Sequence, residues 1–354
     1  MKAKMLRAAM SAAMLAGLLL AGVASADVLY TVTPLGTFGG SDSYAMGINA
    51  KGEVVGDAAT SGNAAYQAFL YDGTMHDLGN LPGGTSSYAL SINNSGQIVG
   101  WASTNGNSGE HAFLYDGTMH DIGSSFGGTD SYATSINNSG QIVGSSFGGT
   151  SSYALSINDS GQIVGNATTS TGAPHAFFYD GTMHDLGTLP GGTGTYANGI
   201  NDRGQIVGGA YTSNGEIHAF LYDGTAGMQD LGTLVGRTTS WAFGINTSGE
   251  IVGFTRNSVD DHAFLYDGTM RDLNSLLAPG SGWTITEARA INDNGWIAAS
   301  GTNPDVNGGA IQALLLTPAA EPSTVPLPSA AWAGMALLGI MGIGRYVGRK
   351  HVIA

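Results

Sequence analysis

The sequence of 354 residues contains no cysteine, and only 11% of its residues are charged. The absence of cysteine excludes disulfides and every metal or catalytic site that depends on a thiolate. An exported protein can do without disulfides when its hydrophobic core is large, so the composition is compatible with export. Glycine is abundant, at 57 residues, but it follows no Gly-X-Y period, and apolar residues alternate regularly. This pattern argues against a collagen-like or disordered chain.

Basic residues are also scarce, and they are unevenly placed. Six of the twelve lie near the two ends of the chain, and all 26 acidic residues lie between them, which leaves the central region with a net charge of −20. Such a surface repels nucleic acid and anionic lipid, so we expect no nucleic-acid partner. The six terminal bases are Lys2, Lys4, Arg7, Arg345, Arg349 and Lys350.

Residues 1–26 have the order of a secretory signal peptide. Basic residues at the start precede an apolar segment at 12–23, and a small-residue cleavage site with Ala24 and Ala26 comes directly before Asp27. Signal peptidase would cleave there, and the alternative is an uncleaved membrane anchor. The sequence therefore predicts a protein exported across the inner membrane.

A second targeting region is predicted at the C-terminus. A Pro-rich spacer at 319–329 precedes an apolar segment at 330–344 and a basic tail at 345–354. The apolar segment is short for a transmembrane helix, but counted from Val325 it reaches the length that is needed. The tail, with Arg345, Arg349 and Lys350, would stay in the cytoplasm.

The order of Pro motif, apolar segment and basic tail resembles the PEP-CTERM sorting signal of Gram-negative bacteria. The motif residues are Val325, Pro326, Leu327 and Pro328. The resemblance implies an exosortase as processing enzyme, which would remove the tail and deliver the protein to the cell surface or extracellular matrix. The sequence departs from the family pattern at Leu327, where the family has Glu, and at residues 351–354, which extend past the basic cluster. The alternative is a permanent single-pass anchor.

One unit of four predicted strands is repeated between the two ends. In the copy at residues 87–123, an Asn-Asn-Ser-Gly turn joins the first two strands and an Asp-Gly turn joins the last two. Complete copies recur every 43 to 46 residues, and four strands in such a period are typical of a β-propeller blade. The first hairpin contains an Ile-Asn pair and occurs seven times, at Asn49, Asn93, Asn137, Asn158, Asn201, Asn246 and Asn292.

The second hairpin occurs only six times, because residues 123–144 are followed at once by a near copy of themselves at an offset of 21 residues. The sequence thus predicts an all-β propeller at residues 27–318, with either six blades and an inserted hairpin or seven blades of which one is incomplete. The chain after residue 26 opens with a segment that matches a fourth strand, and the array ends with a third strand. We therefore expect the N-terminal strand to complete the last blade and close the ring.

The repeated motif HAFLYDGTMHDLG resembles the HAF family of probable extracellular repeats, and the resemblance covers residues 29–318. It implies an exported repeat protein. The family is defined by its repeat and not by a reaction, so it carries no catalytic residues to transfer to this chain.

The repeated histidines and aspartates are predicted to be structural, because each copy lies on a different blade and they cannot converge on one metal ion. We predict no metal site and no cofactor. Unique residues lie in the last blade, where Glu287 replaces an aromatic residue and Arg289 a mostly apolar one, with Trp283 and Trp296 nearby. These four are the candidates for ligand binding. The competing explanation is that a closing blade differs because its packing differs.

The predicted function is that of an exported binding or structural module, surface-anchored or associated with the extracellular matrix, without catalysis. An exopolysaccharide or a surface protein would be its partner, and the C-terminal segment would contact the membrane. Two alternatives stay open. The first is an extracellular propeller hydrolase or lyase that acts on glycans near the ring axis, around Glu287. The second is a ring stabilised by Ca²⁺ at its acidic surface.

Overall fold

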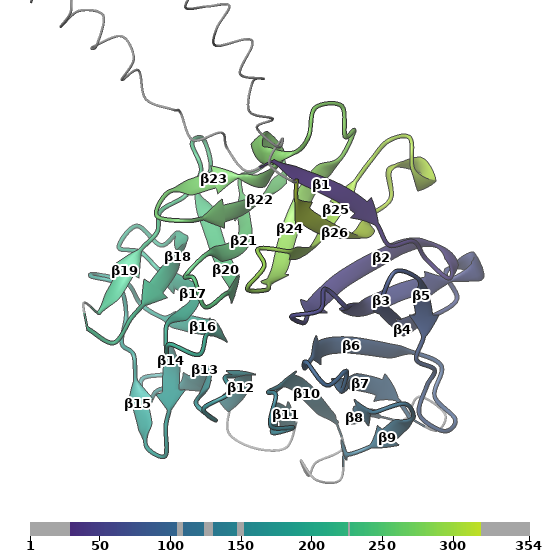
Figure 1. Cartoon of the computed structure of the whole chain (residues 1–354). Helices are drawn as coiled ribbons and strands as arrows, with labels where there is room; N and C mark the ends of the chain where they lie inside the picture. The colour runs from purple at the N-terminus through teal and green to yellow at the C-terminus, as the bar shows by residue number, and fades with distance from the viewer. Residues whose placement is uncertain (1–28, 105–108, 124–129, 147–151, 226, 320–354) are drawn as a thin grey trace, which may run out of the picture. The chain divides into compact units, whose positions relative to one another are not determined.

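The computed structural model describes residues 29–104, 109–123, 130–146, 152–225 and 227–319. They form a β-propeller, in which antiparallel sheets are arranged around a central axis (Figure 1). Six sheets have four strands and one has two, so the predicted all-β propeller is confirmed. The predicted signal peptide, sorting motif, apolar segment and basic tail lie outside the described residues. Within the described ranges, no helix has the length and apolar character needed to cross a membrane.

Each four-stranded blade has its inner strand beside the axis and its fourth strand at the rim. The first two blades contain β2 (Gly39–Ile48), β3 (Val54–Thr60), β4 (Tyr66–Tyr71) and β5 (Met75–Asp77), then β6 (Ser87–Ile92), β7 (Ile98–Ser103), β8 (Glu110–Tyr115) and β9 (Met119–Asp121). The two-stranded sheet contains β10 (Ser131–Ile136) and β11 (Ile142–Ser146).

The next three blades contain β12 (Ser152–Ile157), β13 (Ile163–Thr168), β14 (Pro174–Tyr179) and β15 (Met183–Asp185), then β16 (Thr195–Ile200), β17 (Ile206–Tyr211), β18 (Ile217–Tyr222) and β19 (Met228–Asp230), then β20 (Thr239–Ile245), β21 (Ile251–Arg256), β22 (Asp261–Tyr266) and β23 (Met270–Asp272). The closing blade contains β24 (Thr284–Ile291), β25 (Ile297–Thr302), β26 (Gln312–Pro318) and β1 (Tyr30–Pro34). Short 3₁₀ helices are η1 (Ser61–Asn63), η3 (Leu273–Leu276) and η4 (Asn307–Gly309).

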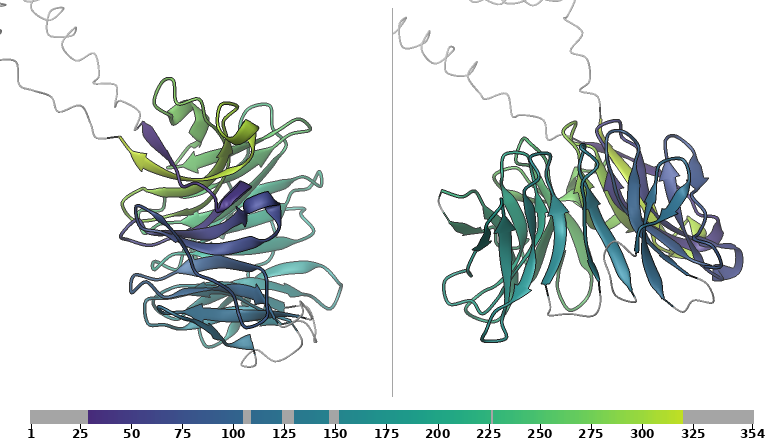
Figure 2. Two further views of the ribbon diagram at one scale, coloured as in Figure 1. Left: turned by 90° about the vertical axis from the view of Figure 1, so that its right-hand side faces the viewer. Right: turned by 90° about the horizontal axis from the view of Figure 1, so that it is seen from below.

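The ring is closed by the N-terminal strand, as the repeat pattern predicts. β1 pairs antiparallel with β26, from Tyr30 opposite Pro318 to Pro34 opposite Leu314. Figure 2 shows the same contact from the side, with the purple strand lying along the yellow-green blade. The pairing covers the edge that β26 would otherwise expose, and it buries Tyr30 with the apolar core of the closing blade.

Small side chains let the inner strands approach one another. A Cβ atom on Gly199 would lie 2.5 Å from the carbonyl oxygen of Phe243 in the next blade. The glycine of the repeated Ile-Val-Gly in the second strand is explained by a different contact. In each of these blades the inner strand has a β-bulge opposite this glycine. At the bulge between Ala89 and Ser91, a Cβ atom on Gly100 would lie 1.9 Å from the Tyr88 carbonyl oxygen. Glycine is therefore required at that position.

Seven buried asparagine side chains join the blades into a closed hydrogen-bonded ring. The Nδ2 group of each donates to the backbone carbonyl of the corresponding asparagine in the next blade, at 2.9 to 3.2 Å. The last bond, from Asn292 to Asn49, closes the circle at 2.9 Å. Within each blade the Oδ1 atom accepts backbone N–H groups of the following turn. In Asn93, for example, it accepts those of Ser95 and Gln97, each at 3.0 Å. Turn formation and blade-to-blade contact thus depend on one side chain.

The asparagine ring also decides between the two predicted blade counts. Asn137 of the two-stranded sheet receives a hydrogen bond from Asn93 and donates one to Asn158. The β10–β11 hairpin therefore occupies a full place around the axis and is not an insertion beside it. The ring has seven places, six filled by four-stranded blades and one by an incomplete blade.

The substitution Asn246→Asp tests the asparagine ring. Asn246 Nδ2 donates to Glu250 Oε2 at 2.6 Å and to the Asn292 carbonyl at 3.2 Å, so a carboxylate would face two acceptors. We expect it to lower the free energy of unfolding by about 2–4 kcal/mol. Denaturant titration followed by circular dichroism measures the change. Thr247→Ala, which loses one exposed hydrogen bond to Asp293, is the control and should cost about 1 kcal/mol or less. Equal losses in the two variants would contradict this role of the ring.

Candidate functional site

A cleft of about 770 Å³ lies between the blade of β20–β23 and the closing blade. One wall is aromatic and comes from β20 and β21, with Trp241, Phe243 and Phe254. The facing wall comes from β24 and is polar. Its residues are Thr284, Thr286, Glu287 and Arg289.

The polar wall depends on an irregularity of β24. Besides the bulge that it shares with the other inner strands, β24 has a register shift against β25 between Ile285 and Glu287. Consecutive residues of a regular strand point to opposite faces, but a bulge turns one of them. Thr286 and Glu287 consequently both line the cleft. This local change distinguishes the closing blade from the repeated ones.

Arg289 connects the two walls. Its guanidinium carbon lies 4.2 Å from the centroid of the Phe243 ring, and its Nη2 atom lies 2.8 Å from Glu287 Oε1. The Nε atom of Arg289 is buried and has no hydrogen-bond partner among the described residues. Burial raises the pKa of Glu287 above its ordinary value, and the charge of Arg289 offsets this effect only in part. The pair therefore leaves one buried donor, Arg289 Nε, without a partner among the described residues.

A second arginine makes a similar arrangement at the mouth of the cleft. The guanidinium carbon of Arg256 lies 5.0 Å from the Phe254 centroid. Its Nε and Nη2 atoms donate to the two oxygens of Asp261, each at 2.7 Å. This bidentate geometry fixes the plane of the guanidinium group.

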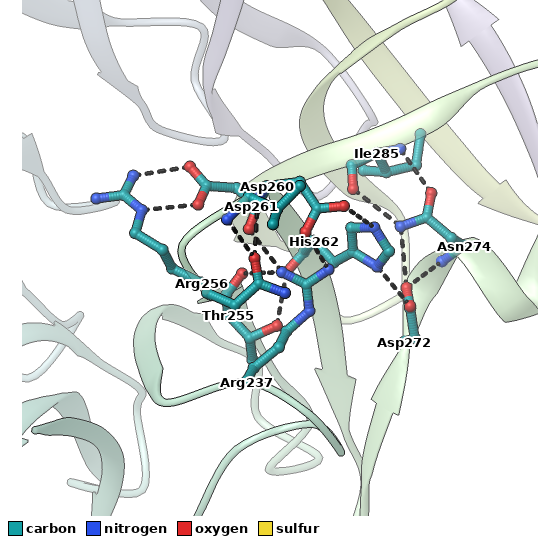
Figure 3. Close-up of polar contacts among 11 residues, drawn as sticks. Arg237, Thr255, Arg256, Asp260, Asp261, His262, Asp272, Asn274 and Ile285 are labelled. Carbon is teal, nitrogen blue, oxygen red and sulfur yellow. Dashed lines mark hydrogen bonds and ion pairs between the residues drawn. The ribbon is translucent and has the colours of Figure 1, made fainter.

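Behind this pair, a polar network holds the edge of the cleft (Figure 3). Arg237, whose side chain is 7% exposed, donates to Asp260 Oδ1 at 2.9 Å and to the Asp260 carbonyl at 2.7 Å. His262 lies between Asp272, at 2.7 Å from its Nδ1 atom, and Asp260, at 3.4 Å from its Nε2 atom. Asp272 accepts from Asn274, which exchanges two hydrogen bonds with the backbone of Ile285 on β24. The network thus ties β22 and β23 to the closing blade.

Two of the four predicted ligand-binding residues meet in the cleft, and two lie elsewhere. Glu287 and Arg289 line it, whereas Trp283 packs against the core of the closing blade. Trp296 packs between the closing blade and the first blade, and its ring lies 2.2 Å from where a Cβ atom on Gly52 would be. The aromatic residues that do line the cleft belong to a neighbouring blade.

The central axis contains two smaller cavities. One, of about 220 Å³, lies among the inner strands, and Arg289 and Phe243 line both it and the cleft. The other, of about 200 Å³, lies at the asparagine ring, where Asp159, Asp202 and Asp293 are also found. Those three carboxylates accept backbone N–H groups of the preceding blade at 2.8 to 2.9 Å, so they are part of the ring contacts.

The repeated histidines form pairs with aspartates. On the third strand, His111 Nδ1 lies 2.9 Å from Asp121, and equivalent contacts occur at His175, His218 and His262. On the fourth strand, His76 Nε2 lies 2.9 Å from Asp72 of the preceding turn, and this contact recurs at His120 and His184. No group of three or more potential ligands that could hold a metal ion exists within the described part of the chain.

A further unusual acid lies in the first blade. Asp57 on β3 is 3% exposed, and its burial raises its pKa to about 7. It lies opposite Tyr44 in the strand register, next to a row of rings in which Tyr44, Tyr66 and Tyr88 follow one another at centroid distances of 6.4 and 6.0 Å. Burial is the main cause of the raised pKa of Tyr88, and the charge of Asp57 adds to it. The buried carboxyl group of Asp57 is therefore protonated over part of the neutral range.

Comparisons with known proteins support the fold, and one family model matches part of the chain. Residues 150–309 match a family model described as "Protein of unknown function (DUF3466)". The match begins before β12 and ends in η4, so it includes every lining residue of the cleft except Ile311. No curated protein matches the chain. The resemblances to HAF repeats and to a PEP-CTERM signal stay predictions.

Among solved structures, the β-propeller domain of the Trilobed protease from Pyrococcus furiosus matches with a TM-score of 0.53 and 13% identity, over 78% of this chain and 93% of that one. The acylaminoacyl peptidase of Pyrococcus horikoshii matches with a TM-score of 0.48 and 12% identity, over 77% of this chain and 52% of that one. The Aleuria aurantia lectin matches with a TM-score of 0.37 and 14% identity, over 82% of this chain and all of that one. At such identities the first likeness shows the propeller fold alone.

The substitution Asp57→Asn tests the buried carboxyl. The pKa of Asp57 is raised from 3.8 to about 7, so the unfolded chain loses its proton at lower pH than the folded chain does. The stability from this group is complete below pH 3.8 and is lost as the pH rises to about 7, by up to about 4 kcal/mol. The difference in unfolding free energy between Asp57→Asn and the parent should therefore grow in favour of the variant across this range. Denaturant titrations at several pH values measure it, and a difference that does not change with pH would show that Asp57 is not buried in this way.

Proposed function

We propose that the protein is an exported propeller that binds a saccharide chain in the cleft between β20–β22 and β24, with a polysaccharide of the extracellular matrix as its partner. The observation that carries the proposal is the combination of an aromatic wall with the facing Glu287 and Arg289, whose buried Nε atom has no partner among the described residues. Export and surface attachment are supported by the sequence of residues 1–26 and 325–354.

The chemistry of the cleft suits a neutral, polyhydroxylated ligand. Saccharide rings have apolar C–H faces that pack on aromatic side chains, and hydroxyl groups that need both donors and acceptors. Trp241 and Phe243 supply the aromatic surface. Glu287 supplies hydrogen-bond acceptors and Arg289 supplies donors. Each arginine of the cleft is paired with a carboxylate, and the third carboxylate, Asp260, is paired with Arg237 behind the wall, so the walls offer no unbalanced charge for a strongly ionic ligand.

The network around Arg237 and His262 supports the same proposal. It fixes Asp260 at the cleft before a ligand arrives, as Arg256 fixes Asp261. A preorganised site does not lose affinity to the ordering of its own loops. A saccharide offers only modest contact energy per ring, so such a site benefits from rigid walls.

Binding to immobilised exopolysaccharides and their oligosaccharides, followed by calorimetry with the strongest binder, tests the proposal. Arg289→Ala removes the contact that joins both walls, and we expect its Kd to be higher by about tenfold or more. Arg203→Ala is the matched control, because Arg203 is exposed in the turn between β16 and β17 and should leave Kd unchanged. Absence of saccharide binding by the parent protein, or equal Kd values in all three proteins, would overturn the proposal.

A second candidate is hydrolysis or elimination on a glycan in the same cleft, and one observation favours it. The pKa of Glu287 is raised by burial, as in a general acid, and Asp261 lies in the same cleft. We expect bound oligosaccharides to be recovered intact after long incubation, because Glu287 is held by Arg289. Release of reducing or unsaturated sugar ends that is lost in Glu287→Gln would instead assign catalysis to the cleft.

A further inference from the structure

A second groove lies on the second blade, away from the cleft. Its volume is about 430 Å³, and it is lined by Tyr88, Trp101, Glu110 and Asp130 together with small polar residues. The described lining residues combine two aromatic rings with two carboxylates and include no basic side chain. The remaining members are Thr85, Ser86, Ser103 and Gly109.

The aromatic and acidic groups of the groove are held in place. The rings of Tyr88 and Trp101 stack with centroids 4.0 Å apart and planes inclined by 17°. Tyr132 approaches Trp101 edge-on at 5.6 Å, and its hydroxyl donates to Glu110. Asp130 Oδ1 accepts the backbone N–H of Glu110 at 3.0 Å. Two negative groups are thus fixed beside an indole ring.

The blade of β20–β23 contains the same aromatic and acidic positions, together with an arginine that contacts both. In the strand register, Tyr88 pairs with Trp101 and Ser103 pairs with Glu110. The equivalent pairs are Trp241 with Phe254 and Arg256 with Asp261. The two blades therefore place an aromatic ring and a carboxylate at the same positions.

One position differs in chemistry between these two blades. In the later blade, Arg256 places its guanidinium group 5.0 Å from the Phe254 ring and bonds both oxygens of Asp261. In the second blade the same position holds Ser103, a small neutral residue that lines the groove and supplies no cation. The Ser103 hydroxyl instead accepts the backbone N–H groups of Thr85 and Ser86. The second blade therefore keeps the aromatic ring and the carboxylate of this arrangement but has no guanidinium group of its own.

We propose that the groove beside Trp101 binds a guanidinium group from outside the chain, of the kind that an arginine side chain carries. Glu110 supplies the opposite charge, and Trp101 supplies the ring against which a planar cation packs. Arginine fits better than lysine, because the blade of β20–β23 holds its guanidinium through two parallel N–H···O bonds, a geometry that an ammonium group does not reproduce. The net charge of −20 in the central region also attracts a cationic ligand.

The test is calorimetric titration of the full chain with Nα-acetyl-arginine amide. Nα-acetyl-lysine amide is the cationic comparison, and Nα-acetyl-citrulline amide is the neutral ligand of the same shape. We expect the arginine probe to bind most tightly and the citrulline probe at least about tenfold more weakly. Added salt should weaken the arginine complex, because part of the attraction is between charges. Citrulline binding as tight as arginine binding would overturn the proposal.

Variants of the chain assign the binding to the groove. Glu110→Gln retains an acceptor for Tyr132 but removes the charge, and we expect it to weaken arginine binding by about tenfold or more. Ser103→Arg should fill the groove with its own cation and abolish binding. Ser103→Ala loses the same hydroxyl contacts without adding a charge, and it should bind as the parent does. Thermal melting of each variant confirms that it is folded.

A variant of the cleft separates this proposal from the saccharide proposal. Arg289→Ala should leave arginine binding unchanged, because Arg289 lies in a different blade. Arginine binding that survives in both Glu110→Gln and Ser103→Arg, or that is lost in Arg289→Ala, would place the cation elsewhere and overturn the inference.

Discussion

Seven hydrogen bonds between buried asparagine side chains and the backbone of the next blade determine how this propeller closes. Each blade can bury only one face of its sheet against each neighbour, so the ring is stable only when all places are filled. The asparagine ring sets the number of places at seven, even where the chain supplies two strands instead of four. The incomplete blade at β10–β11 is tolerated because its inner hairpin makes every contact that the ring requires. Among the outer strands, only β1 takes part in closure, by pairing with β26, and the others contribute packing at the rim.

This constraint also explains where the blades are free to differ. The turns at the asparagine ring repeat the same residues because their side chains bond both within and between blades. The opposite ends of the strands do not take part in the asparagine ring, so their side chains can vary from blade to blade. Positions such as Trp101, Phe254 and Asp57, which are equivalent in the repeat, hold an indole, a phenyl ring and a buried carboxyl group. The cleft and the groove both lie at these variable positions, and the structural positions supply the rigid frame that orients them.

Much of the fold is predictable from the sequence, because strand alternation, Asp-Gly turns and strand number per repeat are local properties. The closure by β1 is predictable as well, since the first and last segments complete one blade. Glu287 and Arg289 are detectable as departures from the repeat. The aromatic wall of the cleft is not, because Phe243 and Phe254 resemble ordinary core residues until the neighbouring blade is placed beside them. The asparagine ring is not predictable from the sequence either, for another reason. An asparagine before a Ser-Gly turn has a sufficient local explanation, and the second role of its side chain depends on a partner in another blade.

A repeat protein offers an internal comparison that a single-copy fold does not. When two blades share a backbone register, a side chain present in one and missing in the other shows what the shared environment accommodates. Arg256 demonstrates that an aromatic ring and a carboxylate at these positions hold a guanidinium group with two hydrogen bonds. The second blade keeps the ring and the carboxylate, and has serine in place of the arginine. Glu110 and Asp130 accept hydrogen bonds from Tyr132 and from the Glu110 backbone, but no basic side chain among the described lining residues of the groove balances their charge. The difference between the two blades therefore identifies the chemistry of the ligand from the chain itself, independently of any similarity to other propellers.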